Sequence, residues 1–487
     1  MNKSNSYLFL LLLVGLFTTK AAAQVKIGNN PTTIGNSSLL ELESTNKGLV
    51  LPRVANTSAI ANPVDGMFVY DMSSKCAKSY ENGAWSGCLS GGGPSAISAN
   101  CDPNTNGFLG TYAPGESVSI LGAKSFKVTL VNNSLFEGSI TPATSDVTLS
   151  GASGLTIASV SPSTTTAIPG GGSLTITYTL GGTVPSTGVV TATFVKNGLT
   201  CSNTLDVTVT PTLSKTILTT CTQTATGTGL SSWVSNNTGN ATINSSTGLL
   251  TGVNTGNVYI HALKTGTNYR VGKLYTVNDY RRTFNSSGSG TLTIPGTDIV
   301  SFQAEAYGAG GGGGGACGGC APDQIGGSGG SGAYTLKLYT VSSGNTSISY
   351  TVGNGGSGGI TTADGVAGGN SIITYASNTI TARGGRGGEG TTPFGGGVAV
   401  TATGGDVNTN GASGVNGTFS SCNVNGRGGV AGAGPSGGAG GTSSSGNGGN
   451  GAQPGGSGAG GGINSACNDS TGGSGGDGRV VITYTCP

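Results

Sequence analysis

The sequence predicts an all-β protein made of several small domains. Its 487 residues allow about three domains at ~150 residues each. Only 8% of residues are charged and 95 are glycine, which argues against a charged disordered chain. Glycine keeps no strict every-third position, so collagen is excluded. Gly, Thr, Ser and Asn form helices poorly, and apolar residues alternate with period two, so strands are favoured over a helical bundle.

Residues 1–23 have the pattern of a secretory signal peptide. Lys3 supplies the positive start, residues 8–17 form the apolar run, and three alanines at 21–23 fit cleavage before Gln24. The apolar run is shorter than the ~20 residues that a membrane span needs. We expect an exported chain with no membrane span after cleavage. Its location is then the cell surface or the extracellular space, with the periplasm as the alternative.

The ten cysteines predict disulfides, because their number is even and the chain is expected to be exported. We expect Cys76 to pair with Cys88 and Cys101 with Cys201. The Cys317-Gly-Gly-Cys320 motif has redox spacing, but polyglycine flanks replace the strand and helix of a redox site, so we interpret it as a structural bridge. The pairing stays open for Cys221, Cys317, Cys320, Cys422, Cys467 and Cys486.

Residues 24–93 form a first module of short strands and turns. Pro52 and Pro63 break helices, and Asn82-Gly83 is a hairpin signal. The runs LLELESTNKGLVLPR and NPVDGMFVY, followed by Trp85, resemble an N-terminal module of secreted and tail-fibre-like proteins of Bacteroidota. The resemblance implies a cell-surface or fibre context and no chemistry.

Residues 98–210 alternate with period two and predict an immunoglobulin-like sandwich. Turn-forming clusters separate the strands at the spacing typical of such sandwiches. Three apolar faces stand out: Phe126, Val128 and Leu130; Leu174, Ile176 and Tyr178; Leu205, Val207 and Val209. A Cys101–Cys201 bridge would tie the first strand to the last.

Residues 211–282 predict a second β unit. The order Trp233, Ala241-Thr-Ile, Gly248-Leu-Leu-Thr-Gly and Val258-Tyr-Ile resembles bacterial immunoglobulin-like group 2 repeats, with Ile243 in place of the usual valine. In that family such units are mostly stalk modules of surface adhesins.

Residues 283–487 begin and end with strand patterns and are rich in glycine between them. The marks Thr293-Ile-Pro, Ala306-Tyr-Gly-Ala-Gly and Gly476-Asp-Gly-Arg-Val-Val-Ile resemble the glycine-rich domain of bacterial surface proteins and phage-tail-type adhesins. We expect residues 284–487 to fold as one unit. We further expect the last strand, residues 480–485, to return to the sheet begun at Thr291.

The polyglycine between these strands allows two interpretations. Glycine loses the most backbone entropy on ordering and has no side chain to pack, which favours a flexible linker. Polyproline II helices with three residues per turn are the ordered alternative, because glycine lets neighbouring backbones exchange hydrogen bonds. We prefer the ordered interpretation, since strands flank the glycine on both sides.

Catalytic and nucleic-acid-binding patterns are weak. Gly326-Gly-Ser328-Gly-Gly fits a nucleophile elbow, but chance explains such a match in this composition, and His261 is the one histidine. No motif nominates a metal or a cofactor. The formal charge of +2 falls to zero when cleavage removes Lys3 and Lys20, and no basic stripe extends beyond Arg281-Arg282, so we expect no nucleic-acid partner.

The function predicted from the sequence is a non-enzymatic surface or fibre-type adhesin, with a cell-surface glycan or protein as ligand and a possible homo-oligomer. Loops on a rigid β scaffold present binding residues, and Tyr, Asn, Ser and Gly suit adaptable recognition. The candidate tip residues are Phe394, Asn408, Asn410, Phe419, Asn423 and Asn425. The alternatives are a structural component of an extracellular matrix or filament, and a secreted hydrolase with an unrecognised site.

Overall fold

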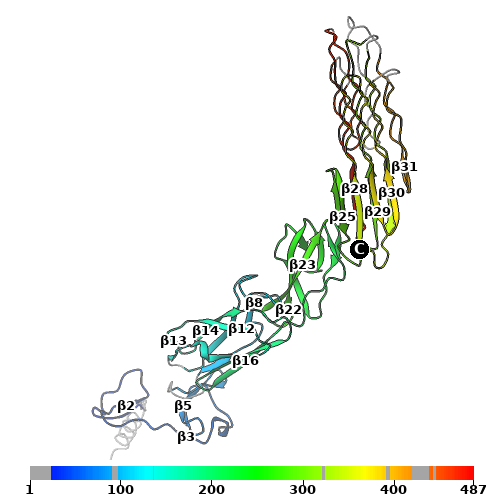
Figure 1. The fold of residues 1–487 in the computed structure, drawn as a ribbon. Helices are drawn as coiled ribbons and strands as arrows, with labels where there is room; N and C mark the ends of the chain where they lie inside the picture. Colours follow the sequence, from blue (N-terminus) through cyan, green and yellow to red (C-terminus); the bar gives the residue numbers. More distant parts are fainter. Residues whose placement is uncertain are drawn as a thin grey trace, which may run out of the picture.

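The computed structural model describes residues 24–89, 97–134, 137–320, 324–390, 395–418, 438–442, 446–464 and 466–487. Nearly all regular structure in these ranges is strand, which confirms the all-β class, and the units follow one another in an elongated molecule (Figure 1). Within the described ranges, no helix is long and apolar enough to span a membrane. The expected signal peptide, residues 1–23, lies outside them.

The N-terminal module, residues 24–89, holds two small sheets. A parallel pair is made of β1 (Val25–Ile27) and β2 (Leu40–Leu42). The second sheet has the order β3-β4-β5-β6, with β3 (Arg53–Val54), β4 (Met67–Asp71), β5 (Cys76–Glu81) and β6 (Ala84–Trp85), and the 3-10 turn η1 (Thr57–Ala59) precedes β4. Asn82 and Gly83 turn β5 into β6 with φ of 56° and 77°. Both lie in the left-handed region that this hairpin turn requires.

The first sandwich buries the faces that alternation predicts. Phe126, Val128 and Leu130 have 0% exposed surface, as have Ile176 and Tyr178. Its elements are β7 (Ile97–Asn100), β8 (Gly107–Tyr112), β9 (Ser125–Asn132), β10 (Gly138–Ile140), η2 (Thr144–Asp146), β11 (Val147–Gly151), β12 (Leu155–Ser161), β13 (Thr166–Ile168), β14 (Ser173–Gly182), β15 (Val189–Lys196) and β16 (Leu199–Asp206). One sheet runs β12-β14-β9-β8, with β7 on β9, and the other runs β11-β15-β16.

The second sandwich packs a three-stranded sheet against the end of a longer one. Its strands are β17 (Ile217–Leu218), β18 (Thr222–Thr224), β19 (Leu230–Ser235), β20 (Ala241–Ile243), β21 (Leu249–Gly252), β22 (Gly256–Lys264) and β23 (Tyr269–Asn278). β23 pairs in parallel with β8, so one nine-stranded sheet crosses from the first sandwich into the second. Tyr112 and Tyr269 meet edge to face at this junction. The sequence suggested two separate units and gave no sign of this shared sheet.

The third sandwich is the unit from which the glycine-rich segments extend (Figure 1). One sheet has the order β24-β33-β26-β27-β32 and the other β25-β28-β29-β30-β31. Their bounds are β24 (Arg281–Phe284), β25 (Gly288–Thr293), β26 (Ser301–Tyr307), β27 (Tyr334–Thr340), β28 (Ser347–Val352), β29 (Ser371–Tyr375), β30 (Asn378–Ala382), β31 (Ala402–Thr403), β32 (Val407–Thr409) and β33 (Arg479–Tyr484). Phe302, Tyr375 and Tyr484 fill the core between the sheets.

The last strand does not return to the sheet that contains Thr291, which corrects the expectation from the sequence. Thr291 lies in β25, whereas β33 lies between β24 and β26 in the opposite sheet. The chain changes sheets between β24 and β25, and alternation within a strand cannot reveal on which of two facing sheets that strand lies.

Candidate functional site: the glycine bundle and its distal end

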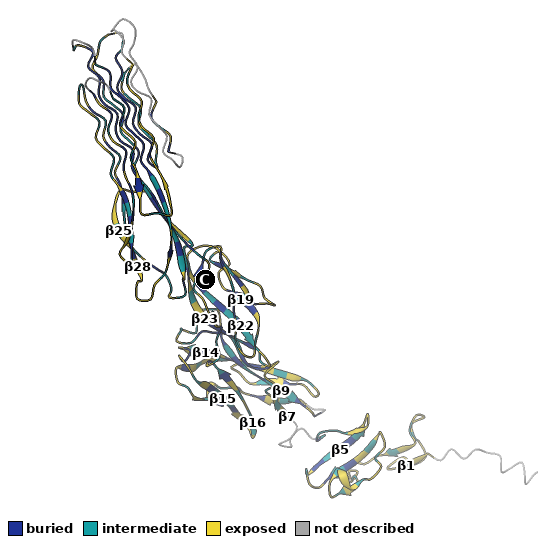
Figure 2. Cartoon of the chain, turned by 90° about the vertical axis from the view of Figure 1, so that its right-hand side faces the viewer, coloured by how far each residue is buried: buried dark blue, intermediate teal, exposed yellow. Residues whose placement is uncertain are grey.

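The glycine-rich segments form an ordered bundle that extends from the third sandwich (Figure 1). Residues 308–316 run through its centre, and every residue from 308 to 318 is buried. Six extended segments surround them: 325–333, 353–360, 363–370, 383–390, 455–463 and 470–478. We call these seven segments and the shorter outer ones the glycine bundle. Figure 2 shows its inner segments largely in the colour of buried residues.

Hydrogen bonds in the bundle repeat every three residues. Successive amides of the central segment donate to three different neighbours, all antiparallel to it. The pairs, donor first, are Gly310–Gly476 and Gly313–Gly473, Gly311–Gly330 and Gly314–Gly327, and Gly312–Val366 and Gly315–Ala363, at 2.9–3.0 Å. Three residues per turn is the period of polyproline II, which makes no internal hydrogen bonds and leaves them for neighbours. The bundle therefore has the ordered form rather than that of a linker.

Glycine is required inside the bundle because the backbones lie too close for a Cβ. An added Cβ on Gly313 would lie 2.0 Å from the carbonyl oxygen of Ala459, and one on Gly460 would lie 2.0 Å from that of Gly326. Contacts below 3.0 Å are essentially absent for real Cβ atoms. The core of the bundle thus consists of paired backbones and not of apolar side chains.

Polar side chains satisfy amides at the outside of the bundle, where no carbonyl faces them. Asn447 Oδ1 accepts from the Thr471 amide at 3.0 Å, and three residues later Asn450 Oδ1 accepts from the Ser474 amide at 2.9 Å. Asp477 Oδ1 likewise accepts from the Gly355 amide at 2.7 Å. These asparagines and this aspartate therefore hold the bundle together.

The turns between bundle segments gather at the end farthest from the sandwich, which we call the distal end. Its described parts are residues 317–320, the turn around 360–363, Asn464 and residues 466–469. Cys317 and Cys320 form a disulfide there, as the structural interpretation of the motif expects. The Ile360 side chain is 67% exposed in the next turn. This end offers polar turns and one exposed isoleucine on a rigid support.

The candidate tip residues divide into two groups. Phe394, Phe419, Asn423 and Asn425 lie outside the described residues. Asn408 lies in β32, at the junction of sandwich and bundle, where Asn408 Oδ1 accepts from Thr335 Oγ1 at 2.8 Å. Asn410 directly follows that strand. Asn408 therefore fixes an edge strand, and both residues lie away from the distal end.

Two of the four disulfides between described cysteines join distant parts of the chain. The structure pairs Cys76 with Cys88 and Cys101 with Cys201, the two pairs expected from the sequence. It also pairs Cys221 with Cys486, across 265 positions. Sequence reasoning left that pair open, because no local pattern connects two cysteines so far apart. Cys422 lies outside the described residues.

The N-terminal module exposes an unusual amount of apolar surface for its size. Its large exposed side chains are Val25, Ile27, Leu39, Leu40, Leu42, Leu49, Val50, Val64, Phe68 and Met72. Leu39 is 78% exposed and Val50 is 73% exposed. We call these ten side chains the apolar surface of the module. Single exposed apolar residues are ordinary, whereas ten in a module of this size are unusual.

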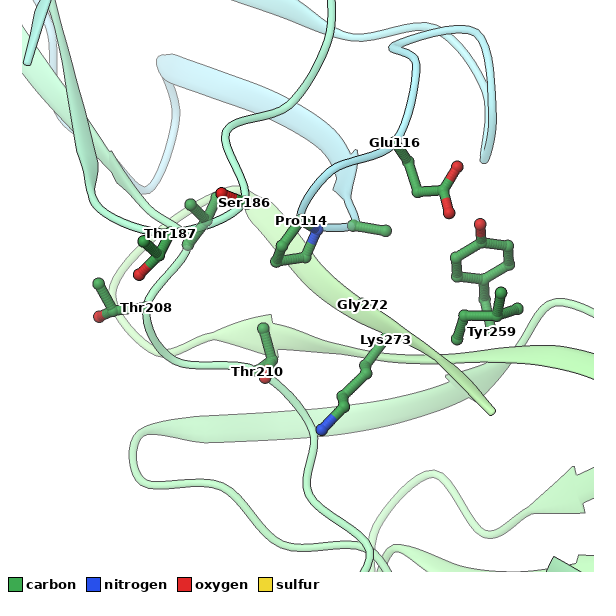
Figure 3. Close-up of a pocket in the computed structure, with 12 residues that line it drawn as sticks. Pro114, Glu116, Ser186, Thr187, Thr208, Thr210, Tyr259, Gly272 and Lys273 are labelled. Carbon is green, nitrogen blue, oxygen red and sulfur yellow. The ribbon is translucent and has the colours of Figure 1, made fainter. Parts of the chain in front are cut away.

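A hollow of about 340 Å³ lies between the first and second sandwiches (Figure 3). Glu116 points toward the Tyr259 hydroxyl, and burial together with this carboxylate raises the pKa of Tyr259 to about 12. Lys273 and several threonines complete the lining. The charged residues in the described lining are Glu116 and Lys273, so the hollow does not contain two carboxylates that could act as a catalytic pair. We interpret it as space left at the junction of the two sandwiches. A larger hollow of about 640 Å³ lies between residues 293–300 and 341–346.

The remaining catalytic candidates have structural surroundings. Ser328 is fully buried in the bundle, and its Oγ accepts from the Val415 amide at 2.8 Å. His261 lies in β22, and burial lowers its pKa to about 4. Among the described residues, no group of three or more His, Cys, Asp and Glu side chains could hold a metal ion.

Two regions match known protein families. Residues 26–100 match the model of the phage tail like trimerisation region, and residues 283–485 match the model of a glycine-rich domain. No curated protein matches the chain. The first match covers the N-terminal module, and the second covers the third sandwich together with the glycine bundle.

A solved structure that resembles the chain is the C-terminal 282-residue fragment of intimin in complex with the intimin-binding domain of the translocated intimin receptor. The identity is 15%, the TM-score is 0.16, and the match covers 39% of this chain. The chain spans 65% of the length of that fragment. At this TM-score the likeness supports no conclusion about function.

Proposed function

We propose that this chain is a non-enzymatic, exported adhesin of fibre type. Copies assemble through the N-terminal module, and the distal end of the glycine bundle binds a glycan or a protein on a cell surface. The observation that carries the proposal is the separation of two surfaces along one elongated molecule, with exposed apolar residues at one end and clustered turns at the other (Figure 1).

Assembly is supported by the apolar surface of the module together with the family match. The matched region carries the name of a trimerisation region, so three copies are the favoured number. At such an interface Leu39, Leu49 and Val50 would be buried away from water. This burial would stabilise the assembly by roughly 25 cal/mol for each Å² of apolar area buried.

Binding at the distal end is supported by the architecture of the bundle. Its interior is closed by backbone hydrogen bonds, so ligands meet only its outer surface and its end. Turns held on a rigid scaffold are the usual place for recognition, and exposed Ile360 offers an apolar contact among polar neighbours.

Export is supported by four disulfides between described cysteines, because such bonds persist in oxidising compartments. The cell surface or the extracellular space is the proposed location. An origin among the Bacteroidota stays a prediction from residues 39–85 alone.

The test of binding uses adsorption of labelled mature protein to intact bacterial cells and to a glycan array. Ile360→Lys, at the distal end, should weaken adsorption about tenfold or more, which corresponds to ~1.4 kcal/mol. The matched control is Val366→Lys, because Val366 is 55% exposed on the side of a neighbouring bundle segment. This control should leave adsorption unchanged.

Other outcomes would overturn the proposal. Equal adsorption by both variants and the unchanged protein would place binding elsewhere. Filaments that grow with protein concentration, without adsorption, would favour a matrix component. Turnover of a polysaccharide panel would favour a hydrolase.

A further inference from the structure

We infer that the Cys101–Cys201 and Cys221–Cys486 disulfides form a covalent load line from the distal end to the N-terminal module. Of the first two sandwiches, only residues 97–101 and 201–221 lie in the path of the tension. This mechanical function goes beyond the proposed adhesion and needs no knowledge of the ligand. It rests on where each bond enters and leaves the fold.

The first bond bypasses the first sandwich. Cys101 directly follows β7, where the chain enters that sandwich, and Cys201 lies in β16, its last strand. The bond closes a loop of sequence separation 100 that contains the other strands of the unit. Tension that arrives at Cys101 therefore continues at Cys201, and the residues between them cannot be drawn out.

The chain next runs along the second sandwich to its far junction. Near the first junction, the Asp206 amide donates to Tyr269 Oη at 3.0 Å, and Lys264 lies 3.2 Å from the Asp206 carboxylate. At the far junction, β17 pairs with the last residues of β23, Val277 and Asn278. A single segment thus connects the two junctions.

The second bond bypasses the second sandwich. Cys221 follows β17, and Cys486 follows β33, the last strand of the chain. Leu218 and Cys221 also belong to the apolar core of the third sandwich. The strands β18 to β23 lie inside the closed loop, so tension does not reach them.

From Cys486 the load line continues to the distal end through a segment whose backbone is already almost fully extended. β33 lies between β24 and β26 and leads directly into bundle segment 470–478. Amides of this segment, such as those of Gly472 and Gly475, donate to carbonyls of segment 353–360. A polyproline II helix already rises ~3.1 Å per residue, against at most ~3.3–3.6 Å for a fully extended chain. Tension therefore lengthens this segment little.

Single-molecule stretching tests the inference on the mature full-length chain. One handle is attached at Gln24, and the other is inserted between the exposed residues Asn468 and Asp469 of a distal turn. In the oxidised protein we expect extension from the N-terminal module and none from the strands of the two sandwiches that lie inside the disulfide loops. Cys101→Ser with Cys201→Ser should add a gain of about 330–360 Å, because the loop of separation 100 enters the path.

Two controls make the readout specific. Cys76→Ser with Cys88→Ser should add only about 40 Å, from a separation of 12. Cys317→Ser with Cys320→Ser should add nothing, because that bond lies off the line. If the Cys101/Cys201 variant does not fold, dithiothreitol added to oxidised molecules under tension should release the same length.

Two results would overturn the load line. One is a gain of about 330–360 Å in the oxidised chain, with its disulfides verified by mass. The other is a folded Cys101/Cys201 variant that shows no added gain before a handle fails. Loss of adsorption to cells changes neither outcome, so this test stands apart from that of the proposed function.

Discussion

Asp71 shows how a single buried carboxylate stabilises the N-terminal module. It is 1% exposed at the end of β4, where Ser73 Oγ donates to it at 2.7 Å and Lys78 Nζ at 3.0 Å. The hydrogen bond from the Ser73 hydroxyl lowers the pKa of Asp71, and the Lys78 ammonium lowers it further. Burial raises this pKa, but the net result lies well below the ordinary value. The charged form is therefore the one that the fold favours.

This environment gives the module a pH dependence with a definite sign. A carboxyl with a lowered folded pKa contributes stability above its unfolded pKa of ~3.9, and that stability is lost as the pH falls toward the folded pKa. We expect the protection of the amides in residues 67–81, measured as the exchange rate relative to the intrinsic rate at each pH, to decrease between about pH 5 and pH 3. Asp71→Asn should flatten this dependence, and the exposed control Glu81→Gln should preserve it. An unchanged pH profile in Asp71→Asn would contradict the assignment.

At the same scale, the sequence shows the types of the polar residues but not their hydrogen-bond partners. Asn408 was a candidate for recognition, and its Oδ1 accepts a hydrogen bond from Thr335 at the edge strand β32. Asn447 and Asn450, which the sequence did not single out, accept hydrogen bonds from backbone amides. The partner of Asn450 is 24 positions away and that of Asn408 is 73 positions away. Such partners follow from the packing of segments, which composition does not encode.

At the scale of elements, the bundle depends on the absence of Cβ atoms along paired backbones. Gly313 and Gly446 make a matched pair, because an added Cβ meets the Ala459 carbonyl at 2.0 Å in the first case and no atom within 4 Å in the second. Substituting each of the two glycines by alanine distinguishes the ordered-bundle interpretation from the flexible-linker interpretation.

We expect Gly313→Ala to destabilise the glycine-rich domain by about 1–3 kcal/mol or more, as overpacking does elsewhere. Gly446→Ala should stay within about 0.5 kcal/mol of the unchanged protein, as open surface positions do. Thermal unfolding followed by calorimetry measures both. Equal tolerance at the two positions would show that the glycine segments do not pack as described.

Elements with a strong local signal were predictable, and their partners were not. The alternating residues indicated the positions of β9, β14 and β33, and most of the ends of these strands lie within one or two residues of the alternating run. The glycine runs also allowed a packed polyproline II form. However, the amide of Gly310 pairs with Gly476, so the neighbours in the bundle depend on which sheet each flanking strand joins. The prediction for β33 was wrong because alternation does not show which of the two sheets a strand joins.

At the scale of the whole molecule, the units connect into one continuous structure. The sheet shared by β8 and β23 joins the first two sandwiches, and the Cys221–Cys486 bond joins the second to the third. A stiff connection suits a protein that holds its distal end away from its point of assembly. The sequence predicted the order of these units, whereas their junctions depend on contacts between distant residues.

Assembly through the N-terminal module is the central claim, and the molar mass of the mature chain in solution tests it most directly. Sedimentation equilibrium should give three times the chain mass. Leu39→Asp or Val50→Asp should reduce it to one chain mass, because a buried carboxylate without a partner opposes the interface. Leu338→Asp, at an equally apolar position 58% exposed on β27, should leave the trimer intact. A single chain mass for the unchanged protein at micromolar concentration, or trimers that survive both module substitutions, would contradict the claim.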